Sequence, residues 1–140
     1  MIKIEHINLT VRDLEESIKM FKVLWPDASI RHRGEVKGGM SGDFEWLHLG
    51  GDDTYIALQA APEKKEFYEN PHVRDFYMHI GIEVQDLEQK LNSLKALGYN
   101  PVVQDDVAER NRAYFLDKSG HYFELVEYLS DDASLKNQYV

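Results

Sequence analysis

Apolar and polar positions alternate in two stretches of this chain, and the second stretch repeats the first at an offset of 73 residues, from His6 to His79. Ile7, Leu9 and Val11 alternate with His6, Asn8 and Thr10, and Ile80, Ile82 and Val84 alternate with His79, Gly81 and Glu83. A period of two predicts a strand with one apolar face. The shared pattern indicates an internal repeat in which each strand carries a histidine on its other face.

Each predicted strand leads into a predicted helix. Asp13 and Asp86 end the strands, and Glu16 and Gln89 follow three residues later, which is the layout of a helix N-cap with its reciprocal partner. Apolar residues then recur at helical spacing, at Leu14, Ile18, Phe21 and Leu24 and at Leu87, Leu91, Leu94 and Leu97. We therefore expect both helices to cover the apolar face of a sheet and to leave the histidine face open.

Three further strands follow each helix, at 29–35, 44–49 and 54–60 and then at 101–104, 112–117 and 121–128. The glycine-rich segment 36–43 reads as a mobile loop. These elements predict an α+β domain over residues 1–128, made of two βαβββ halves at about 1–61 and 75–128. A charged connector at 62–74 joins the halves, and residues 129–140 form a polar tail, expected as a loose arm or a short helix.

Composition narrows the possible roles. A chain of 140 residues is the size of one domain, and its formal net charge of −9 weighs against nucleic acids and anionic membrane surfaces as partners. The chain has no cysteine, which excludes disulfides, thiolate metal sites and thiol nucleophiles. Without a signal-like start or a long apolar run, a soluble cytoplasmic protein is expected.

One acidic residue stands out in the last predicted strand. Glu124 lies among apolar residues, where an ionised carboxylate is costly unless it meets a cation. Two histidines and one carboxylate are the usual protein ligands of a facial site for a divalent metal. We therefore predict a metal site at His6, His79 and Glu124. The repeat places Ala57 where a second carboxylate would stand, and Gln59 on the same strand face is a candidate oxygen donor.

The duplicated unit resembles a known family. The early histidine in each half, together with the turn Asp117-Lys118-Ser119-Gly120-His121-Tyr122-Phe123-Glu124, is similar to the vicinal oxygen chelate superfamily. That group contains glyoxalase I, extradiol dioxygenases, fosfomycin-resistance enzymes and bleomycin-binding proteins, and the resemblance covers the chain from Ile2 to Glu127. It implies a cupped, eight-stranded mixed sheet with helices on the outer face, the metal inside the cup, and a homodimer.

Strand faces and side-chain chemistry suggest roles for further residues. Glu124, Tyr114 and His48 are the candidate catalytic residues, and Trp46, Tyr55, Gln59 and Arg112 are candidate substrate contacts. One divalent ion per site is expected, as iron, manganese, nickel or zinc. Three branches of the family stay open at this point: a glyoxalase-like lyase or isomerase acting on a small vicinal-oxygen substrate, an extradiol-type dioxygenase, and a non-catalytic binding or antibiotic-resistance protein.

Overall fold

The computed structural model describes residues 1–40, 42–61, 78–104 and 107–137. The chain divides into two compact units, Met1–Phe67 and Tyr68–Val140, which are called unit 1 and unit 2 below. The predicted connector at 62–74 lies outside the described residues. Each unit has its own sheet and its own core.

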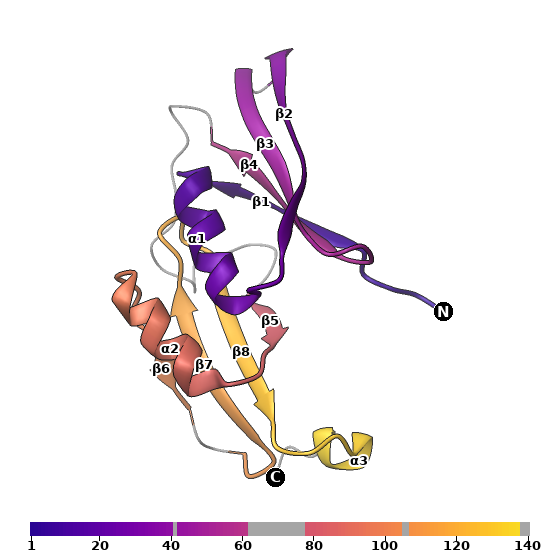
Figure 1. The fold of residues 1–140 in the computed structure, drawn as a ribbon, viewed down its shortest axis with the longest axis vertical. Coiled ribbons are helices and arrows are strands. Elements are labelled where there is room, and N and C mark those ends of the chain that lie inside the picture. The colour runs from indigo at the N-terminus through magenta and orange to yellow at the C-terminus, as the bar shows by residue number, and fades with distance from the viewer. Residues whose placement is uncertain (41, 62–77, 105–106, 138–140) are drawn as a thin grey trace. The chain divides into compact units, whose positions relative to one another are not determined.

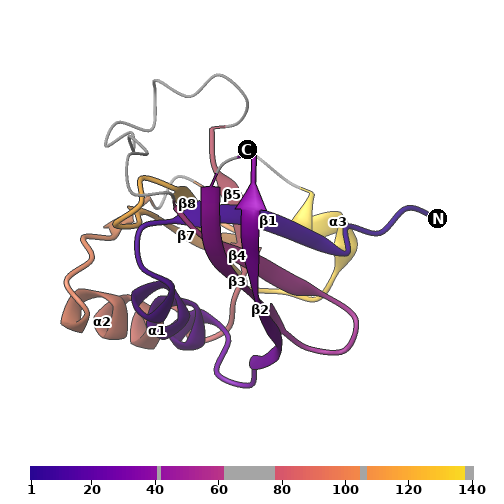
Figure 2. The same cartoon turned by 90° about the horizontal axis from the view of Figure 1, so that it is seen from above.

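Unit 1 is a four-stranded mixed sheet with one helix (Figures 1 and 2). Its elements in chain order are β1 His6–Val11, α1 Leu14–Leu24, β2 Ser29–Gly39, β3 Gly42–Gly50 and β4 Tyr55–Ala60. The strand order is β1-β4-β3-β2, in which β1 runs parallel to β4 and the other pairs are antiparallel. A crossover through α1, β2 and β3 thus brings the first and last strands together.

Unit 2 repeats this topology. Its elements are β5 Ile80–Glu83, α2 Leu87–Ala96, β6 Val102–Val103, β7 Arg110–Leu116, β8 Tyr122–Tyr128 and α3 Ala133–Lys136. The strand order is β5-β8-β7-β6, and β5 runs parallel to β8. The predicted α+β class and the two βαβββ repeats are confirmed. The domain boundaries and the joining of both sheets into one cup stay predictions.

The apolar faces of the strands form the cores, as the alternation predicted. In unit 1, Leu9, Val11, Leu47 and Leu58 are buried together with the inner side of α1. In unit 2 the buried residues include Leu91, Leu94, Ala113, Phe115, Phe123 and Leu125, and the rings of Phe115 and Phe123 stack at 5.3 Å between centroids. Burial of this apolar surface fixes which side of each sheet faces its helix, and so leaves the opposite side for chemistry.

The two helix starts differ, and the prediction is correct for only one of them. Asp13 is the N-cap of α1, where Oδ1 accepts a hydrogen bond from the Glu16 N–H at 2.9 Å. Asp86 occupies the N-cap position of α2 in a left-handed conformation, with φ of 54°, and its side chain makes no cap hydrogen bond. The Leu87 N–H instead donates to Glu127 Oε1 at 3.2 Å, so a carboxylate from β8 replaces the local cap.

The glycine-rich segment 36–43 was wrongly predicted as a loop. β2 continues to Gly39 and β3 begins at Gly42, so this segment is the end of a hairpin in which Gly39 pairs with Gly42. Gly38 and Gly42 have positive φ, and Asp43 Oδ1 accepts a hydrogen bond from the Gly38 N–H at 2.8 Å. The glycines adopt positive-φ backbone conformations at this end of the hairpin, and the register of the β2–β3 pair shifts between Val36 and Gly39.

The C-terminal tail forms a short helix in its described part. α3 follows β8, and the Lys136 carbonyl accepts a hydrogen bond from Arg110 Nη2 at 2.6 Å. Lys136 Nζ also lies 3.1 Å from Glu83 Oε1, which ties α3 to β5. Among the described helices, none is long and apolar enough to cross a membrane.

Candidate functional site

The turn before β8 positions Glu124. Asp117 is buried, and its Oδ1 accepts hydrogen bonds from the backbone N–H groups of Ser119 at 2.9 Å and His121 at 2.7 Å. Gly120 completes this turn at φ of 84°. β8 then starts with a fixed register, so that Phe123 and Leu125 enter the core while Glu124 points to the open face. The turn that resembles the family motif therefore sets the register of β8 and the direction of the Glu124 side chain.

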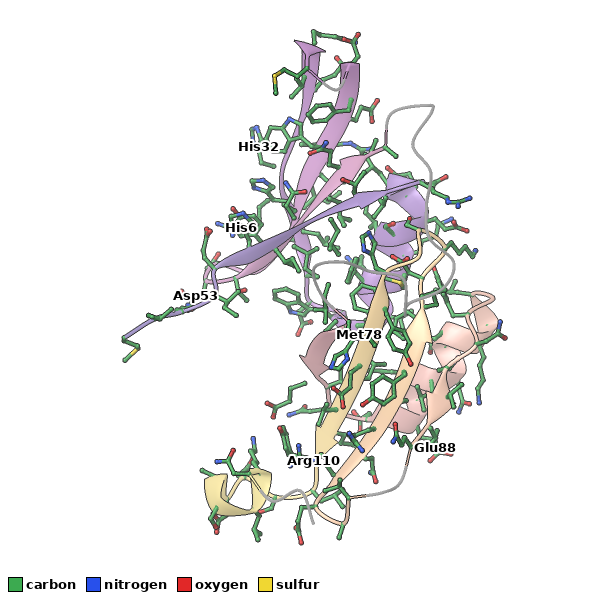
Figure 3. All side chains as sticks on the ribbon, turned by 180° about the vertical axis from the view of Figure 1, so that it is seen from behind. His6, His32, Asp53, Met78, Glu88 and Arg110 are labelled. Atoms are coloured by element: carbon green, nitrogen blue, oxygen red, sulfur yellow. The ribbon has the colours of Figure 1, made fainter. Side chains whose placement is uncertain are left out.

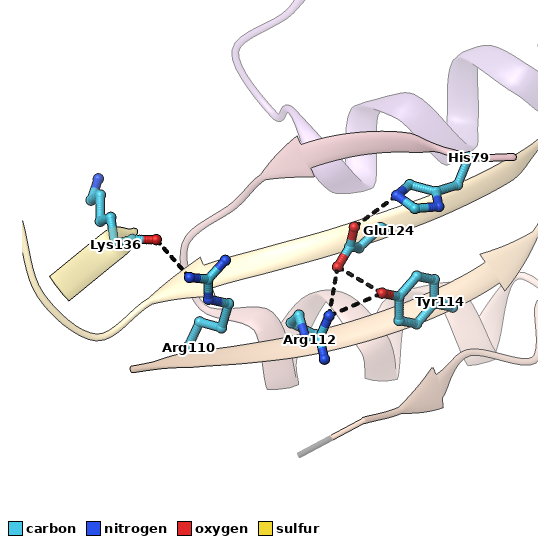
Figure 4. Close-up of polar contacts among 6 residues, drawn as sticks. All are labelled: His79, Arg110, Arg112, Tyr114, Glu124 and Lys136. Carbon is cyan, nitrogen blue, oxygen red and sulfur yellow. Dashed lines mark hydrogen bonds and ion pairs between the residues drawn. The ribbon is translucent and has the colours of Figure 1, made fainter. Parts of the chain in front are cut away.

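Four side chains meet on the open face of the unit 2 sheet (Figure 4). His79 Nε2 lies 2.9 Å from Glu124 Oε2. On the other carboxylate oxygen, the Tyr114 hydroxyl donates to Oε1 at 2.7 Å, and Arg112 Nη1 lies 3.3 Å from the same atom. The structure thus brings together four of the residues that the sequence nominated, and Glu124 is at their centre. We name this set the Glu124 cluster: His79, Arg112, Tyr114 and Glu124.

The electrostatics of this cluster make Tyr114 a hydrogen-bond donor. Burial, followed by the hydrogen bond to the Glu124 carboxylate, raises the pKa of Tyr114 to about 12. The hydroxyl therefore keeps its proton at neutral pH. Only 14% of the Glu124 side chain and 16% of the Arg112 side chain are exposed, so their ion pair is weakly screened compared with a surface pair.

A pocket of about 430 Å³ opens beside the cluster within unit 2. Besides the four cluster residues, its lining includes Gly81, Arg110 and Tyr128. Gly81 is the β5 partner of Glu124, and a Cβ built on it would meet no atom within 4 Å. The missing side chain on β5 leaves room next to the carboxylate. This size suits a small organic molecule.

The His79 and Glu124 pair fits one side of a metal site. Two donor atoms that each lie about 2.1 Å from one ion, at right angles, are about 3 Å apart. The 2.9 Å between Nε2 and Oε2 matches that spacing, and imidazole with carboxylate is a donor set that divalent first-row metals accept. Neither unit, in its described residues, gathers three His, Asp or Glu side chains as a ready ligand set. The third predicted ligand, His6, belongs to unit 1, so the full triad stays a prediction.

The open face of the unit 1 sheet carries rings. His6 stacks on Tyr55 at 4.7 Å, His48 lies 4.4 Å from the same ring, and Trp46 follows at 5.0 Å from His48, all between ring centroids. Arg31 lies 4.4 Å from the centre of the Tyr55 ring. His6 and His32, which Figure 3 labels, both lie on this side of the sheet. We call this surface the aromatic face.

Two features of the aromatic face concern proton transfer and ligand orientation. Burial lowers the pKa of His48, with help from the positive charges of His6, Arg31 and His32, and Glu5 opposes this effect. The lowered pKa favours the neutral imidazole of His48. Glu5 Oε2 lies 2.5 Å from His6 Nδ1, and the hydrogen bond to His6 lowers the pKa of Glu5. This contact engages Nδ1 and leaves Nε2 of His6 for a ligand.

Ala57 and Gln59 fall as the repeat predicted, on the open side of β4. Ala57 is buried and pairs with Asn8 on β1 and with His48 on β3. Gln59 is half-buried and pairs with Trp46. Among the described residues of unit 1, no carboxylate occupies the position that Glu124 holds in unit 2. Whether Gln59 serves as an oxygen donor stays a prediction.

Sequence reasoning missed three neighbours of these residues. Tyr122 lies edge-on to His79 at 6.4 Å and stacks on Tyr114 at 5.6 Å. His32 is exposed and lies 5.4 Å from Trp46 on the aromatic face, between ring centroids. The alternation could have found Tyr122, because it is two residues before Glu124. Glu5 carries no such signal, since it precedes its strand.

Comparison with known proteins identifies the family. The model of the glyoxalase, bleomycin resistance protein and dioxygenase superfamily matches residues 3–125. The chain belongs to this superfamily. A search of curated proteins finds no match. The glyoxalase superfamily fold is also found among solved structures that share less than a quarter of their residues with this chain.

Three of these structures illustrate the likeness. A glyoxalase family protein from Bacillus cereus is 16% identical, with a TM-score of 0.73, covering 93% of this chain and 96% of its own. A superfamily domain from Frankia sp. EAN1pec is 19% identical, with a TM-score of 0.72 and coverages of 94% and 96%. A mutant of the fosfomycin resistance protein FosX from Listeria monocytogenes, in complex with Mn(II) and 1S,2S-dihydroxypropylphosphonic acid, is 18% identical, with a TM-score of 0.65 and coverages of 97% and 98%.

Proposed function

We propose that this protein is a divalent-metal-dependent enzyme that acts on a small molecule with adjacent oxygen atoms, most closely a glyoxalase-like lyase or isomerase. His79 and Glu124 of unit 2 would hold the ion together with His6, supplied by the same chain or by a partner in a homodimer. Iron, manganese, nickel and zinc all accept this donor set. A cytoplasmic location and a dimer belong to this proposal.

One observation carries it, namely the 2.9 Å approach of His79 Nε2 to Glu124 Oε2 beside a pocket. A superfamily member that binds Mn(II) and a vicinal diol gives chemical support, because such a diol offers two adjacent oxygens. Only 14% of the Glu124 side chain is exposed, on a largely apolar strand, where an ionised carboxylate needs cationic partners such as Arg112 or a metal ion.

The chemistry divides between the ion and the side chains. A divalent ion held by these ligands would stabilise negative charge that develops on adjacent substrate oxygens. His48 is the candidate base, because a neutral imidazole can accept a proton from a substrate carbon or hydroxyl. Trp46 and Tyr55 would pack against the substrate, and Gly81 leaves the space in which its oxygens approach the cluster.

Specific observations also favour two other functions, a dioxygenase and a binding or resistance protein. An extradiol-type dioxygenase is favoured by Tyr114, whose hydroxyl lies 2.7 Å from the ligand Glu124 and would share the site with a catechol oxygen. A binding or resistance protein is favoured by the aromatic face, which suits a planar ligand held without turnover. Loss of turnover on Glu124→Gln favours an enzyme, whereas unchanged ligand affinity in that variant favours a binding protein.

The deciding experiment measures metal content and affinity. Protein purified without chelators should carry about one equivalent of metal per site, and His79→Ala or Glu124→Gln should weaken metal binding by more than about 100-fold. His121→Ala is the matched control, because this imidazole lies in unit 2 but outside the pocket lining. If the parent binds none of manganese, iron, nickel or zinc when each is offered, the enzyme proposal is wrong.

A further inference from the structure

We propose that Arg112 and Tyr114 are positioning residues that grip one oxygen of Glu124, so that this carboxylate serves as a fixed, one-oxygen ligand and does not act as the catalytic base. This inference rests on the proposed metal-dependent function. It assigns a different task to two residues that the sequence nominated for substrate contact and catalysis.

The two oxygens of Glu124 have separate partners. Oε1 accepts from the Tyr114 hydroxyl at 2.7 Å and from Arg112 Nη1 at 3.3 Å. Arg112 Nη1 also lies 3.3 Å from the Tyr114 hydroxyl oxygen, which closes a triangle around Oε1 (Figure 4). Oε2 faces His79 alone among the contacts drawn there. The carboxylate is thus oriented with one oxygen toward the histidine and the other held from behind.

Moving Glu124 away from this position is costly. Departure of the carboxylate would remove the negative charge that now faces the guanidinium of Arg112, a side chain that is only 16% exposed. It would also break a charge-assisted hydrogen bond from Tyr114. A carboxylate that must leave the metal and move toward the substrate to act as a base would need to be held loosely by its neighbours. The proton-transfer role therefore passes to a group outside the cluster, for which His48 is the candidate.

Unit 1 gives an independent argument. β4 has Ala57 in place of the carboxylate, and the residues that pair as Arg112 and Tyr114 do in unit 2 are Trp46 and His48. At these two register positions, an arginine and a tyrosine are found in unit 2, whose strand carries the carboxylate, and not in unit 1. If their task were general substrate contact, nothing would tie them to that unit.

The test measures Co(II) affinity and the visible absorption of the Co(II)-loaded protein. Tyr114→Phe and Arg112→Met should each weaken Co(II) binding by about 10-fold to 100-fold, as expected when outer partners of a ligand are removed. Their absorption bands should change in position or intensity, because a released carboxylate can bind through both oxygens. Arg112→Lys should recover part of the affinity. Tyr122→Phe is the control, because it removes a hydroxyl from the ring that stacks on Tyr114, whereas the donors to Glu124 Oε1 are Tyr114 and Arg112.

The outcomes separate this inference from the proposed function. If the parent protein binds no Co(II), both fail. If the parent binds Co(II) and His79→Ala abolishes binding, while Tyr114→Phe and Arg112→Met bind as the parent does, the positioning role is wrong and the metal site stands. Equal weakening in Tyr122→Phe would also overturn the inference, because packing alone would then explain it. Circular dichroism of each variant checks that the fold is kept.

Discussion

β4 of unit 1 presents Ala57 between Asn8 and His48, whereas β8 of unit 2 presents Glu124 between Gly81 and Tyr114. In unit 1 the first strand carries the larger side chain, Asn8, and the last strand carries Ala57. In unit 2 the first strand has Gly81 and the last strand carries the larger side chain, Glu124. An aromatic face results in one case and a charged cluster beside a pocket in the other. Two sheets of one topology thus support different chemistry.

The helix-facing sides keep their apolar character, although some residues change: Leu47 and Leu49 of β3 stand where β7 has Ala113 and Phe115. Leu58 in β4 and Leu125 in β8 are both fully buried at equivalent positions. Core positions are constrained by packing, since a change of even one methylene alters stability. Open-face positions are constrained by function. A repeat can therefore keep its core while its two open faces become specialised.

The largest effect should come from the side that the two units share. Leu58→Ala and Leu125→Ala should each lower the free energy of unfolding by about 2–5 kcal/mol, because each leaves a cavity under its helix. Urea unfolding followed by circular dichroism measures both. The comparison predicts similar costs. A cost near zero for one of them would mean that its unit does not depend on the same core.

A carboxylate placed in unit 1 tests the difference between the open faces. Ala57→Glu should lower the free energy of unfolding by roughly 1–3 kcal/mol, because this buried position lacks the arginine and tyrosine that surround Glu124. Adding His48→Tyr should recover part of the loss by supplying a hydroxyl donor. If Ala57→Glu alone is neutral in urea unfolding, unit 1 already offers the carboxylate a partner and the contrast is weaker than described.

Substitutions at the two helix starts should change stability by smaller amounts and in opposite directions. Asp13→Ala should cost about 1 kcal/mol, because it removes the hydrogen bond to the Glu16 N–H. Asp86→Gly should instead raise stability by up to about 1 kcal/mol, because glycine adopts the left-handed conformation without strain. Thermal unfolding of both variants is the measurement. A loss in Asp86→Gly as large as that in Asp13→Ala would show that the Asp86 side chain has a capping role.

The smallest effect concerns pH and the aromatic face. Burial lowers the pKa of His48 in the folded chain, so the unfolded chain binds more protons on this group in mildly acidic solution. Its contribution to stability is fully present above the ordinary histidine pKa of about 6.5 and falls as the pH drops through the lowered folded value. Urea unfolding at pH 8 and pH 5 should show a smaller acid loss in His48→Gln than in the parent. Equal losses in both would contradict it.

The sequence by itself determined the internal repeat, which face of each strand is apolar, and Glu124 as the centre of the Glu124 cluster. Alternation of period two identifies which side chains share a face, since it depends only on the pleat of a single strand. That was enough to predict His6, His79 and Glu124 on open faces and the leucines in the cores. Local capping chemistry likewise predicted the start of α1 at Asp13.

Tertiary structure alone decided which open-face residues meet. The pairing of Tyr114 with Glu124 and of His48 with Ala57 is a matter of register between strands, which no local pattern specifies. The hydrogen bond from the Leu87 N–H to Glu127 at the start of α2 could not be predicted for the same reason, because the two residues are 40 positions apart. Trp46 lies across Gly34, where a Cβ would come within 2.7 Å of the indole, and this contact also joins separate strands. Periodicity places a side chain on a face, and only the folded sheet gives it neighbours.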